Sequence, residues 1–233
     1  MFPCSNLSEN INISKGLHLI YEKLYSEFGP QDWWPGDSKL EIIVGAILTQ
    51  AVSWSNVEMA ISNLKDEKLL DIKKLHQIDE NRLAKLIKPS GYYNMKAKKL
   101  KSFVEVIVNE YNSNLNAFGK GKPEQKRKEL LEIYGIGPET ADSILLYAYQ
   151  KPVFVIDTYT KRILSRIGYI KKDISYEKLQ KIIENNIETN QELFNEYHAL
   201  LVMLAKKHCW KSSPLCEECP LNNHYEEEKY AYC

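Results

Sequence analysis

A glycine-rich turn and a carboxylate downstream of it are the residues of this sequence with the clearest chemical potential. Gly135 and Gly137 flank a single isoleucine, and Pro138 suits the first turn of a following helix. Because glycines allow close approach and helix N-termini attract anions, such a turn can hold a phosphate. Asp157 stands at the start of a later predicted helix. It is either the N-cap of that helix or a positioned catalytic carboxylate.

Cysteines form the second candidate constellation. Three of the five gather near the C-terminus as Cys209, Cys216 and Cys219, in a Cys-x6-Cys-x2-Cys run, and Cys233 is the last residue. In an intracellular protein, this spacing indicates a metal site rather than disulfide bonds. The isolated Cys4 is expected to be an ordinary thiol.

The glycine turn and the aspartate together resemble the endonuclease III branch of the helix-hairpin-helix DNA glycosylases. In that family a glycine-rich hairpin is followed, at the spacing seen here, by Val-Asp-Thr with a catalytic aspartate, and Asp157 matches it. The resemblance implies that the Asp157 carboxylate stabilises positive charge on the sugar as the N-glycosidic bond breaks, or activates water. The target base must first leave the stack, which is easiest for a damaged or mispaired base.

Position 139 divides that family, because its bifunctional members carry a lysine there whose amine attacks the sugar carbon. This chain has Glu139, and a carboxylate cannot form a Schiff base. The resemblance therefore implies a monofunctional glycosylase with weak or no lyase activity. Apart from the resemblance, Glu139 reads as a surface carboxylate in the first helical turn, where the helix dipole favours it.

Two further stretches resemble segments with which the family contacts DNA. Residues 45–50 are similar to the segment whose glutamine fills the hole left by the flipped base, so Gln50 would hydrogen-bond the orphaned partner base. Residues 89–98 resemble the turn Gly-x-Tyr-Asn-x-Lys-Ala, which lies against DNA. The resemblance thus implies DNA contacts by Gln50, Tyr93, Asn94, Lys96, Gly135, Gly137, Glu139 and Thr140.

Substrate choice is indicated by Trp33, Trp34 and Pro35, which resemble the Trp-Trp-Pro of 3-methyladenine glycosylases of the endonuclease III type. An alkylated purine is cationic and has a labile glycosidic bond, so stacking on electron-rich indoles favours it over a neutral base. These three residues are the expected base pocket. The alternative is that the tryptophans are core residues.

The cysteine run resembles the iron–sulfur loop of endonuclease III, and thiolates in this number suit a [4Fe-4S] cluster. The expected ligands are Cys209, Cys216, Cys219 and Cys233. The family's fourth position is occupied here by Tyr225, so His224 as a substitute ligand, or an incomplete cluster, stays open. Four thiolates would also suit zinc.

Helices must position all of these residues. Apolar residues recur at helical spacing in several segments, as in Leu40, Ile43, Val44, Ile47 and Leu48, and alternating strand patterns are nearly absent. The sequence predicts an all-α, two-domain helix-hairpin-helix glycosylase fold. Residues 31–151 would form a six-helix barrel with the hairpin, and residues 1–30 with 152–233 a second helical domain with the cysteine loop.

Composition narrows the class of protein. The apolar runs are too short to span a bilayer, so we expect no membrane partner and a location in the cytoplasm, at the nucleoid. The formal net charge is zero, and we expect a monomer. Basic residues crowd two stretches, 96–101 and 120–128, and fit either solvated helix faces or a contact with double-stranded DNA. Two rival functions stay open: an endonuclease III-like oxidised-pyrimidine glycosylase with lyase activity, and a non-catalytic helix-hairpin-helix DNA-binding protein.

Overall fold

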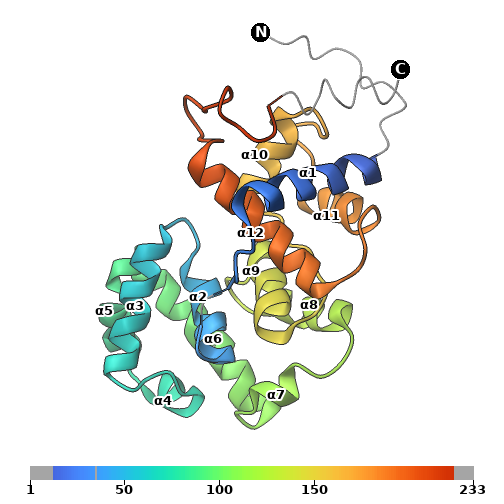
Figure 1. Ribbon diagram of the computed structural model, residues 1–233. Coiled ribbons are helices and arrows are strands. Elements are labelled where there is room, and N and C mark those ends of the chain that lie inside the picture. The colour runs from blue at the N-terminus through green and yellow to red at the C-terminus, as the bar shows by residue number, and fades with distance from the viewer. Residues whose placement is uncertain (1–12, 35, 223–233) are drawn as a thin grey trace. The chain divides into compact units, whose positions relative to one another are not determined.

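The computed structural model describes residues 13–34 and 36–222, and these fold into helices and connecting loops without a strand (Figure 1). The prediction of an all-α fold is confirmed. The predicted roles of Pro35, His224 and Cys233 concern residues outside the described part of the chain. Two compact units divide the protein: a terminal unit of Met1–Trp33 with Phe154–Cys233, and a central unit of Trp34–Val153.

The central unit contains short helices that follow one another closely. They are α2 (Lys39–Leu48), α3 (Trp54–Asp66), α4 (Ile72–Gln77), α5 (Glu80–Leu86), the 3-10 turn η1 (Lys88–Ser90), α6 (Tyr93–Tyr111), α7 (Leu115–Phe118), α8 (Pro123–Glu132), α9 (Pro138–Ser143) and the π-helical turn η2 (Ile144–Ala148). Side-chain caps begin four of them, since Ser38, Asp71, Asp79 and Asn114 each accept from the N–H three residues ahead.

The apolar spacing read from the sequence corresponds to the core of the central unit. Ile43, Val44, Ile47 and Leu48 on α2 are fully buried, and α2 lies against α3, α6 and η2. The C-terminal end of α2 is thereby held inside the unit, and the turn that follows it carries Gln50.

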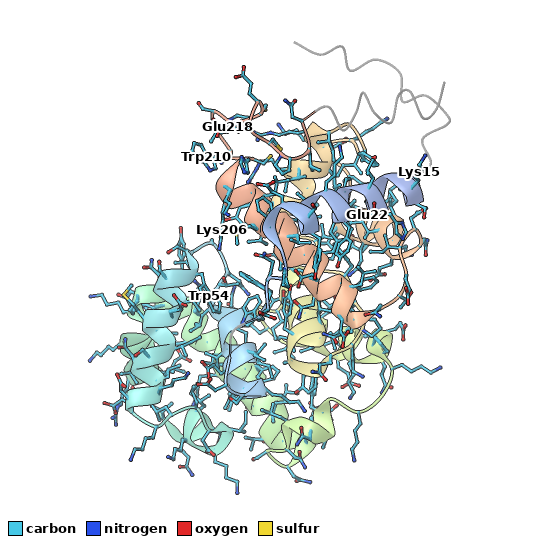
Figure 2. All side chains as sticks on the ribbon, in the orientation of Figure 1. Lys15, Glu22, Trp54, Lys206, Trp210 and Glu218 are labelled. Carbon is cyan, nitrogen blue, oxygen red and sulfur yellow. The ribbon has the colours of Figure 1, made fainter. Side chains whose placement is uncertain are left out.

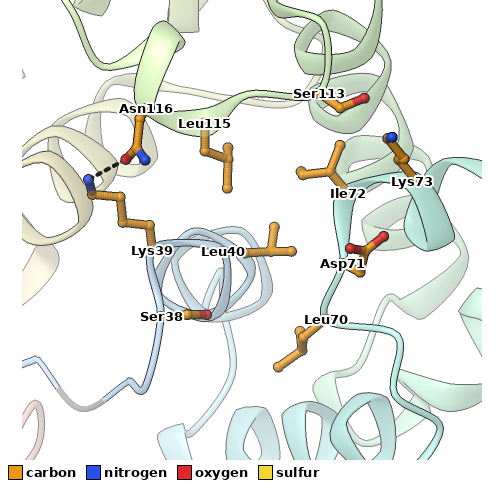
Figure 3. Close-up of a pocket in the computed structure, with 10 residues that line it drawn as sticks. All are labelled: Ser38, Lys39, Leu40, Leu70, Asp71, Ile72, Lys73, Ser113, Leu115 and Asn116. Atoms are coloured by element: carbon orange, nitrogen blue, oxygen red, sulfur yellow. Dashed lines mark hydrogen bonds between the residues drawn. The ribbon is translucent and has the colours of Figure 1, made fainter.

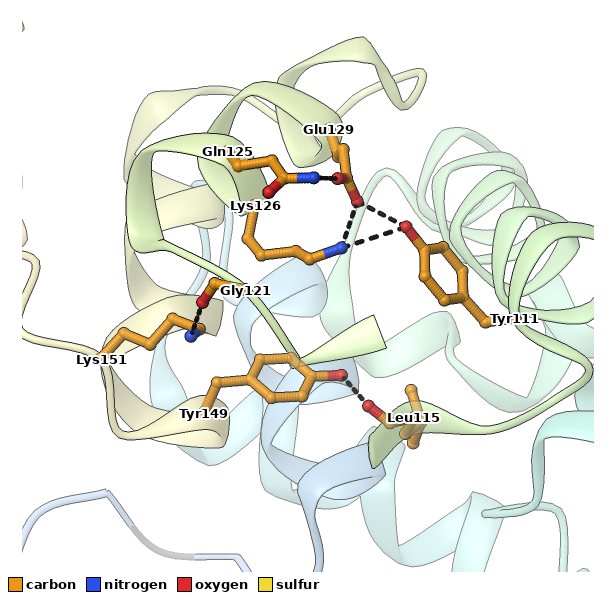
Figure 4. Close-up of polar contacts among 8 residues, drawn as sticks. All are labelled: Tyr111, Leu115, Gly121, Gln125, Lys126, Glu129, Tyr149 and Lys151. Atoms are coloured by element: carbon orange, nitrogen blue, oxygen red, sulfur yellow. Dashed lines mark hydrogen bonds and ion pairs between the residues drawn. The ribbon is translucent and has the colours of Figure 1, made fainter. Parts of the chain in front are cut away.

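Polar contacts hold α8, the helix that leads into the glycine turn (Figure 4). Lys126 is only 4% exposed, and its ammonium donates to Glu129 at 2.7 Å and to the Tyr111 hydroxyl at 3.2 Å. Nearby, the Tyr149 hydroxyl donates to the carbonyl of Leu115 at 3.1 Å. Lys126 lies in one of the two basic stretches. Its burial and its hydrogen bonds show that it holds α8 in place from the inside and is not part of a solvated face.

The terminal unit contains α1 (Ile13–Phe28), α10 (Thr158–Arg166), α11 (Tyr176–Glu184) and α12 (Gln191–Lys207). An aromatic group fills its centre: Phe154 packs edge-on against Phe194 and Tyr197, and the Tyr197 hydroxyl donates to the carbonyl of Leu17 at 2.8 Å. These contacts join α1, α12 and the extended segment that leads to Asp157. Within the part of the chain that the structure describes, no helix has both the length and the apolar character to cross a membrane.

Candidate functional site

The glycine turn joins α8 to α9 in the central unit. Gly135 has a φ of +80°, and a Cβ there would lie 2.2 Å from Cγ of Lys99, so both its conformation and its neighbour require glycine. Gly137 is exposed, and a Cβ there would meet nothing within 4 Å, so its backbone is open to an approaching molecule. α9 begins at Pro138 as predicted, and α8 ends at Glu132.

An ion pair braces the two helices of this hairpin. Arg127 on α8 donates from Nε to Oδ1 of Asp142 at 2.7 Å and from a terminal nitrogen to Oδ2 at 3.1 Å. Asp142 on α9 is completely buried. A bidentate contact of this kind fixes the relative orientation of its two helices as well as neutralising the carboxylate.

Gln50 is held against the hairpin. Its Nε2 donates to Oγ1 of Thr140 at 2.9 Å and to the carbonyl of Gly135 at 3.3 Å. The ammonium of Lys99 donates to Gln50 Oε1. Three of the predicted DNA contacts, Gln50, Gly135 and Thr140, are thus brought together in one hydrogen-bonded group, and Lys99 joins them.

The segment that enters α6 divides between surface and interior. Asn94 is exposed, Tyr93 packs against the core, and Tyr92, with a φ of +44°, is 78% exposed. Lys96, also predicted to contact DNA, is only 2% exposed, and its ammonium donates to the carbonyls of Leu48 at 2.8 Å and Ser90 at 2.5 Å. It therefore supports this turn from the inside.

Burial has an electrostatic consequence for Lys96. Loss of solvation, followed by repulsion from Lys99, lowers the pKa of Lys96 to about 8. Its ammonium nevertheless joins the end of α2, where Gln50 follows, to η1 and the start of α6.

The two predicted pocket tryptophans have different surroundings. Trp34 lies edge-on to Trp54 with ring centroids 4.9 Å apart, and 4.8 Å from Tyr147 on η2. Gly45 lies directly against this group, since a Cβ there would be in van der Waals contact with Trp54 at 3.4 Å. Trp33 instead lies in the terminal unit, with the ammonium of Lys206 5.5 Å from its ring centroid. Figure 2 labels Trp54 and Lys206.

One carboxylate oxygen of Asp157 caps a helix, and the other lies near a histidine. Its Oδ1 accepts from the N–H of Thr160 at 2.7 Å at the start of α10, while Oδ2 lies 3.6 Å from Nε2 of His198 on α12. The side chain is 13% exposed. Burial raises the pKa of this carboxyl, but His198 and Thr160 outweigh it, and the net shift is downward. Asp157 is therefore a carboxylate at neutral pH.

The cysteine loop is anchored to α10. Arg162 Nε donates to the carbonyl of Cys209 at 2.9 Å, and Arg166 donates to Cys209 Sγ at 3.3 Å and to the carbonyl of Trp210 at 2.6 Å. Figure 2 labels Trp210 and Glu218 on this loop. Burial raises the pKa of the Cys219 thiol, and Cys209 and Cys216 raise it further. Among the described residues, no three His, Cys, Asp or Glu side chains are placed to hold a metal ion.

An open pocket of about 470 Å³ lies elsewhere on the central unit (Figure 3). It is lined by Ser38, Lys39, Leu40, Leu70, Asp71, Ile72, Lys73, Ser113, Leu115 and Asn116. These residues include none of the predicted DNA or base contacts. Across it, Lys39 already donates to Asn116 at 2.7 Å, so this hollow is a surface feature separate from the hairpin.

Residues 44–189, which contain Gln50, the hairpin and Asp157, match the HhH-GPD superfamily of base excision DNA repair proteins. The chain belongs to this superfamily. A Methanocaldococcus jannaschii protein named as a candidate DNA repair glycosylase is 46% identical over 207 residues, covering 88% of this chain and 93% of that one. Endonuclease III of Thermotoga maritima is 28% identical over 192 residues, covering 79% and 81%.

Solved structures of DNA repair enzymes share the fold of this chain. The H. pylori 3-methyladenine DNA glycosylase bound to 1,N6-ethenoadenine is 29% identical with a TM-score of 0.71, covering 84% of this chain and 98% of that one. An endonuclease III in a non-covalent complex with DNA shares the fold, with a TM-score of 0.78 at 20% identity, covering 94% and 97%. The protein is thus an HhH-GPD DNA glycosylase related to endonuclease III, and DNA is its partner.

Four of the residues described above were not predicted from the sequence. Lys99 was visible only as one lysine of a basic stretch, and Trp54 and Tyr147 as aromatic residues on expected helices. His198 stands in the apolar run of α12, where a single polar residue among buried neighbours was the available signal. The role of each residue depends on a contact with a residue far away in the sequence.

Proposed function

We propose that the protein is a monofunctional DNA glycosylase that removes alkylated purines such as 3-methyladenine from double-stranded DNA. The observation that carries the proposal is the Asp157 carboxylate, which keeps one oxygen in the helix cap and the other beside His198. Its lowered pKa keeps it ionised at neutral pH. A fixed, nearly buried anion is the group that stabilises positive charge on a sugar.

The chemical step follows from that carboxylate. As the bond between C1′ and the purine nitrogen breaks, the electron pair leaves with the cationic base, which departs neutral. Positive charge passes to the sugar, where Asp157 stabilises it. A water oxygen then bonds to C1′, and the carboxylate accepts the proton that the water loses. An alkylated purine needs little further activation, since it already carries the charge that makes it a leaving group.

The absence of a lyase step is supported by Glu139. It lies exposed in the first turn of α9, the position at which the sequence resemblance expects a lysine in bifunctional enzymes. A carboxylate cannot form the Schiff base that leads to strand cleavage. We therefore expect an intact abasic site as the product.

Preference for a cationic base is supported by the aromatic group of Trp34, Trp54 and Tyr147. Their rings lie within stacking or edge-on distance of one another, and electron-rich faces of this kind attract a cation. Trp33 already lies near the ammonium of Lys206, so we assign it the smaller part in holding a cationic purine. The H. pylori 3-methyladenine DNA glycosylase adds support as a relative of similar fold.

DNA binding is assigned to the hairpin and the start of α6. Gly137, Asn94 and Tyr92 lie at the surface of the central unit, where backbone N–H groups and side chains can reach phosphates. We assign to Gln50 the role of filling the gap that the flipped base leaves in the duplex. Tyr93 and Lys96 hold this segment from beneath.

We also propose a [4Fe-4S] cluster bound by Cys209, Cys216, Cys219 and Cys233. The three described cysteines lie on one loop, close enough for their charges to act on one another, and Arg166 already faces a sulfur. Thiolates of this kind are the donors such a cluster requires. When bound, the cluster would stiffen the loop. Iron and sulfide analysis of the protein purified without oxygen tests it, and zinc in place of iron would overturn it.

The test of function is base release from methylated duplex DNA. Free 3-methyladenine and 7-methylguanine are measured, and strand breaks are scored with and without alkali. Released base with breaks only after alkali is expected. Breaks without alkali would overturn the monofunctional assignment, and no release would overturn the alkylpurine assignment. The matched control is Asp157→Asn, because asparagine caps a helix as well as aspartate does. It should bind DNA and release no base.

A further inference from the structure

The side chain of Gln50 is oriented by two partners whose hydrogen-bonding roles cannot be exchanged. Lys99 can only donate, and the carbonyl of Gly135 can only accept. Lys99 therefore fixes Oε1 of the amide, and Gly135 fixes Nε2. The direction of the amide, which is ambiguous for most glutamines, is determined here by chemistry.

One hydrogen-bonding position of the Gln50 amide is left unused, and it is an acceptor. Nε2 carries two hydrogens, which go to Oγ1 of Thr140 and to the carbonyl of Gly135. Oε1 has two lone pairs, of which Lys99 takes one. The amide can therefore accept one more hydrogen bond, and it has no hydrogen left to donate.

We propose that Lys99 is a positioning residue that makes Gln50 a hydrogen-bond acceptor, and not a donor, toward the base left opposite the flipped nucleotide. This inference rests on the proposed function, in which Gln50 fills the gap in the duplex. It adds a rule of specificity: the enzyme recognises the orphaned base through one of that base's own N–H groups.

The surroundings of Lys99 support this role. Its methylene chain lies over Gly135, where no Cβ could be accommodated. Its ammonium is close enough to Lys96 to depress the pKa of that residue, and Lys96 in turn holds the carbonyl of Leu48 just before Gln50. Lys99 is thus packed on the hairpin and directed at the amide, instead of extending into solvent.

The experiment measures binding to a duplex with a tetrahydrofuran abasic site, so it depends neither on the lesion nor on catalysis. Three bases are placed opposite the site. They are cytosine, 2-pyrimidinone, which lacks only the amino donor, and 3-deazacytosine, which lacks only the ring-nitrogen acceptor. Wild type should bind the 2-pyrimidinone duplex about threefold to tenfold more weakly than the cytosine duplex, the size of one neutral hydrogen bond. It should bind the 3-deazacytosine duplex as tightly as cytosine.

Three variants separate positioning from simple charge or folding effects. Gln50→Leu should abolish the distinction between the analogues. Lys99→Met should reduce it, since the carbonyl of Gly135 alone then opposes rotation of the amide, whereas Lys99→Arg, which keeps a donor, should preserve it. Loss of a phosphate contact would weaken all three duplexes equally, so the ratio of dissociation constants reports orientation alone. Thermal unfolding of each variant verifies its fold.

The outcomes for this inference and for the proposed function are distinguishable. If wild type makes no distinction between cytosine and 2-pyrimidinone, or if Lys99→Met retains it in full, the assignment of Lys99 is overturned. If wild type fails to prefer the abasic duplex over an undamaged one, the proposed DNA-binding role of this surface fails, and the inference with it. Failure to release methylated purines would overturn the proposed substrate alone.

Discussion

Oδ2 of Asp157 lies 3.6 Å from Nε2 of His198, and both side chains are almost entirely buried in the terminal unit. Asp157 begins α10 and His198 lies on α12, so the pair depends on how these two helices pack. A carboxylate beside a group that can carry positive charge is held in its ionised form. This relationship gives the proposed reaction a dependence on pH that can be measured.

Replacing His198 should shift the acid limb of the reaction. His198 is one of the contacts that lower the pKa of Asp157, so in His198→Gln that pKa should rise. Because the reaction requires the ionised carboxylate, activity should then fall at a higher pH than in wild type. Single-turnover base release across pH 3–8, corrected for spontaneous base loss, measures this shift. An unchanged acid limb would show that His198 does not act on Asp157.

Introducing a lysine at position 139 should add a covalent step. Glu139 is exposed, so Glu139→Lys should leave the free energy of unfolding within about 0.5 kcal/mol of wild type. Its amine would be placed to attack the sugar carbon. We expect borohydride to trap a protein–DNA adduct with Glu139→Lys but not with wild type, and Glu139→Gln serves as the uncharged control. Trapping of wild type would instead identify another nucleophilic amine.

The buried Lys96 should make stability depend on pH in the alkaline range. Its folded pKa of about 8 lies below that of a free lysine. Below pH 8 the ammonium is charged in both states, so the cost of burying the charge is fully present. As pH rises toward 10 the folded state releases its proton first, the unfolded state binds more protons, and stability increases.

Comparison with Lys96→Met isolates this effect, because the other titrating groups are common to both proteins. Urea unfolding at pH 8 and pH 10 should show wild type gaining about 1–3 kcal/mol relative to the variant. The variant itself should be less stable at both values, since the carbonyls of Leu48 and Ser90 lose their donor. A constant difference between the two proteins would contradict the lowered pKa.

Breaking the ion pair of the hairpin should destabilise the central unit. Asp142 is completely buried, and Arg127→Met would remove its bidentate partner. A buried carboxylate that loses its partner costs about 3–5 kcal/mol. Urea unfolding of Arg127→Met should show a loss of this size. The double variant Arg127→Met with Asp142→Leu should recover most of it, and failure to recover would mean that the pair contributes through more than charge.

Local chemistry explains what could be predicted from the sequence. The turn needs glycine at Gly135 for its positive φ, and Pro138 suits the first turn of a helix, so both features are visible without a fold. Asp157 at a helix start is equally local, and its side chain does cap α10. The helical period of α2 follows from its own apolar residues.

Other features depended on contacts between distant segments. The direction of Lys96 could not be predicted, because a lysine in a basic stretch is ordinarily solvated, and only the neighbouring carbonyls of Leu48 and Ser90 make its burial tolerable. Trp34 contacts Trp54 and Tyr147 only after α3 and η2 have packed in the central unit.

The sequence by itself thus determined the family, the hairpin and the candidate carboxylate, since these depend on residue type and on spacing along one segment. Only the tertiary structure decided that His198 faces Asp157 and that Lys99 faces Gln50. Hydrogen bonds and ion pairs require groups within a few ångströms of each other and correctly oriented. Between residues far apart in the chain, that geometry exists only after the helices have packed.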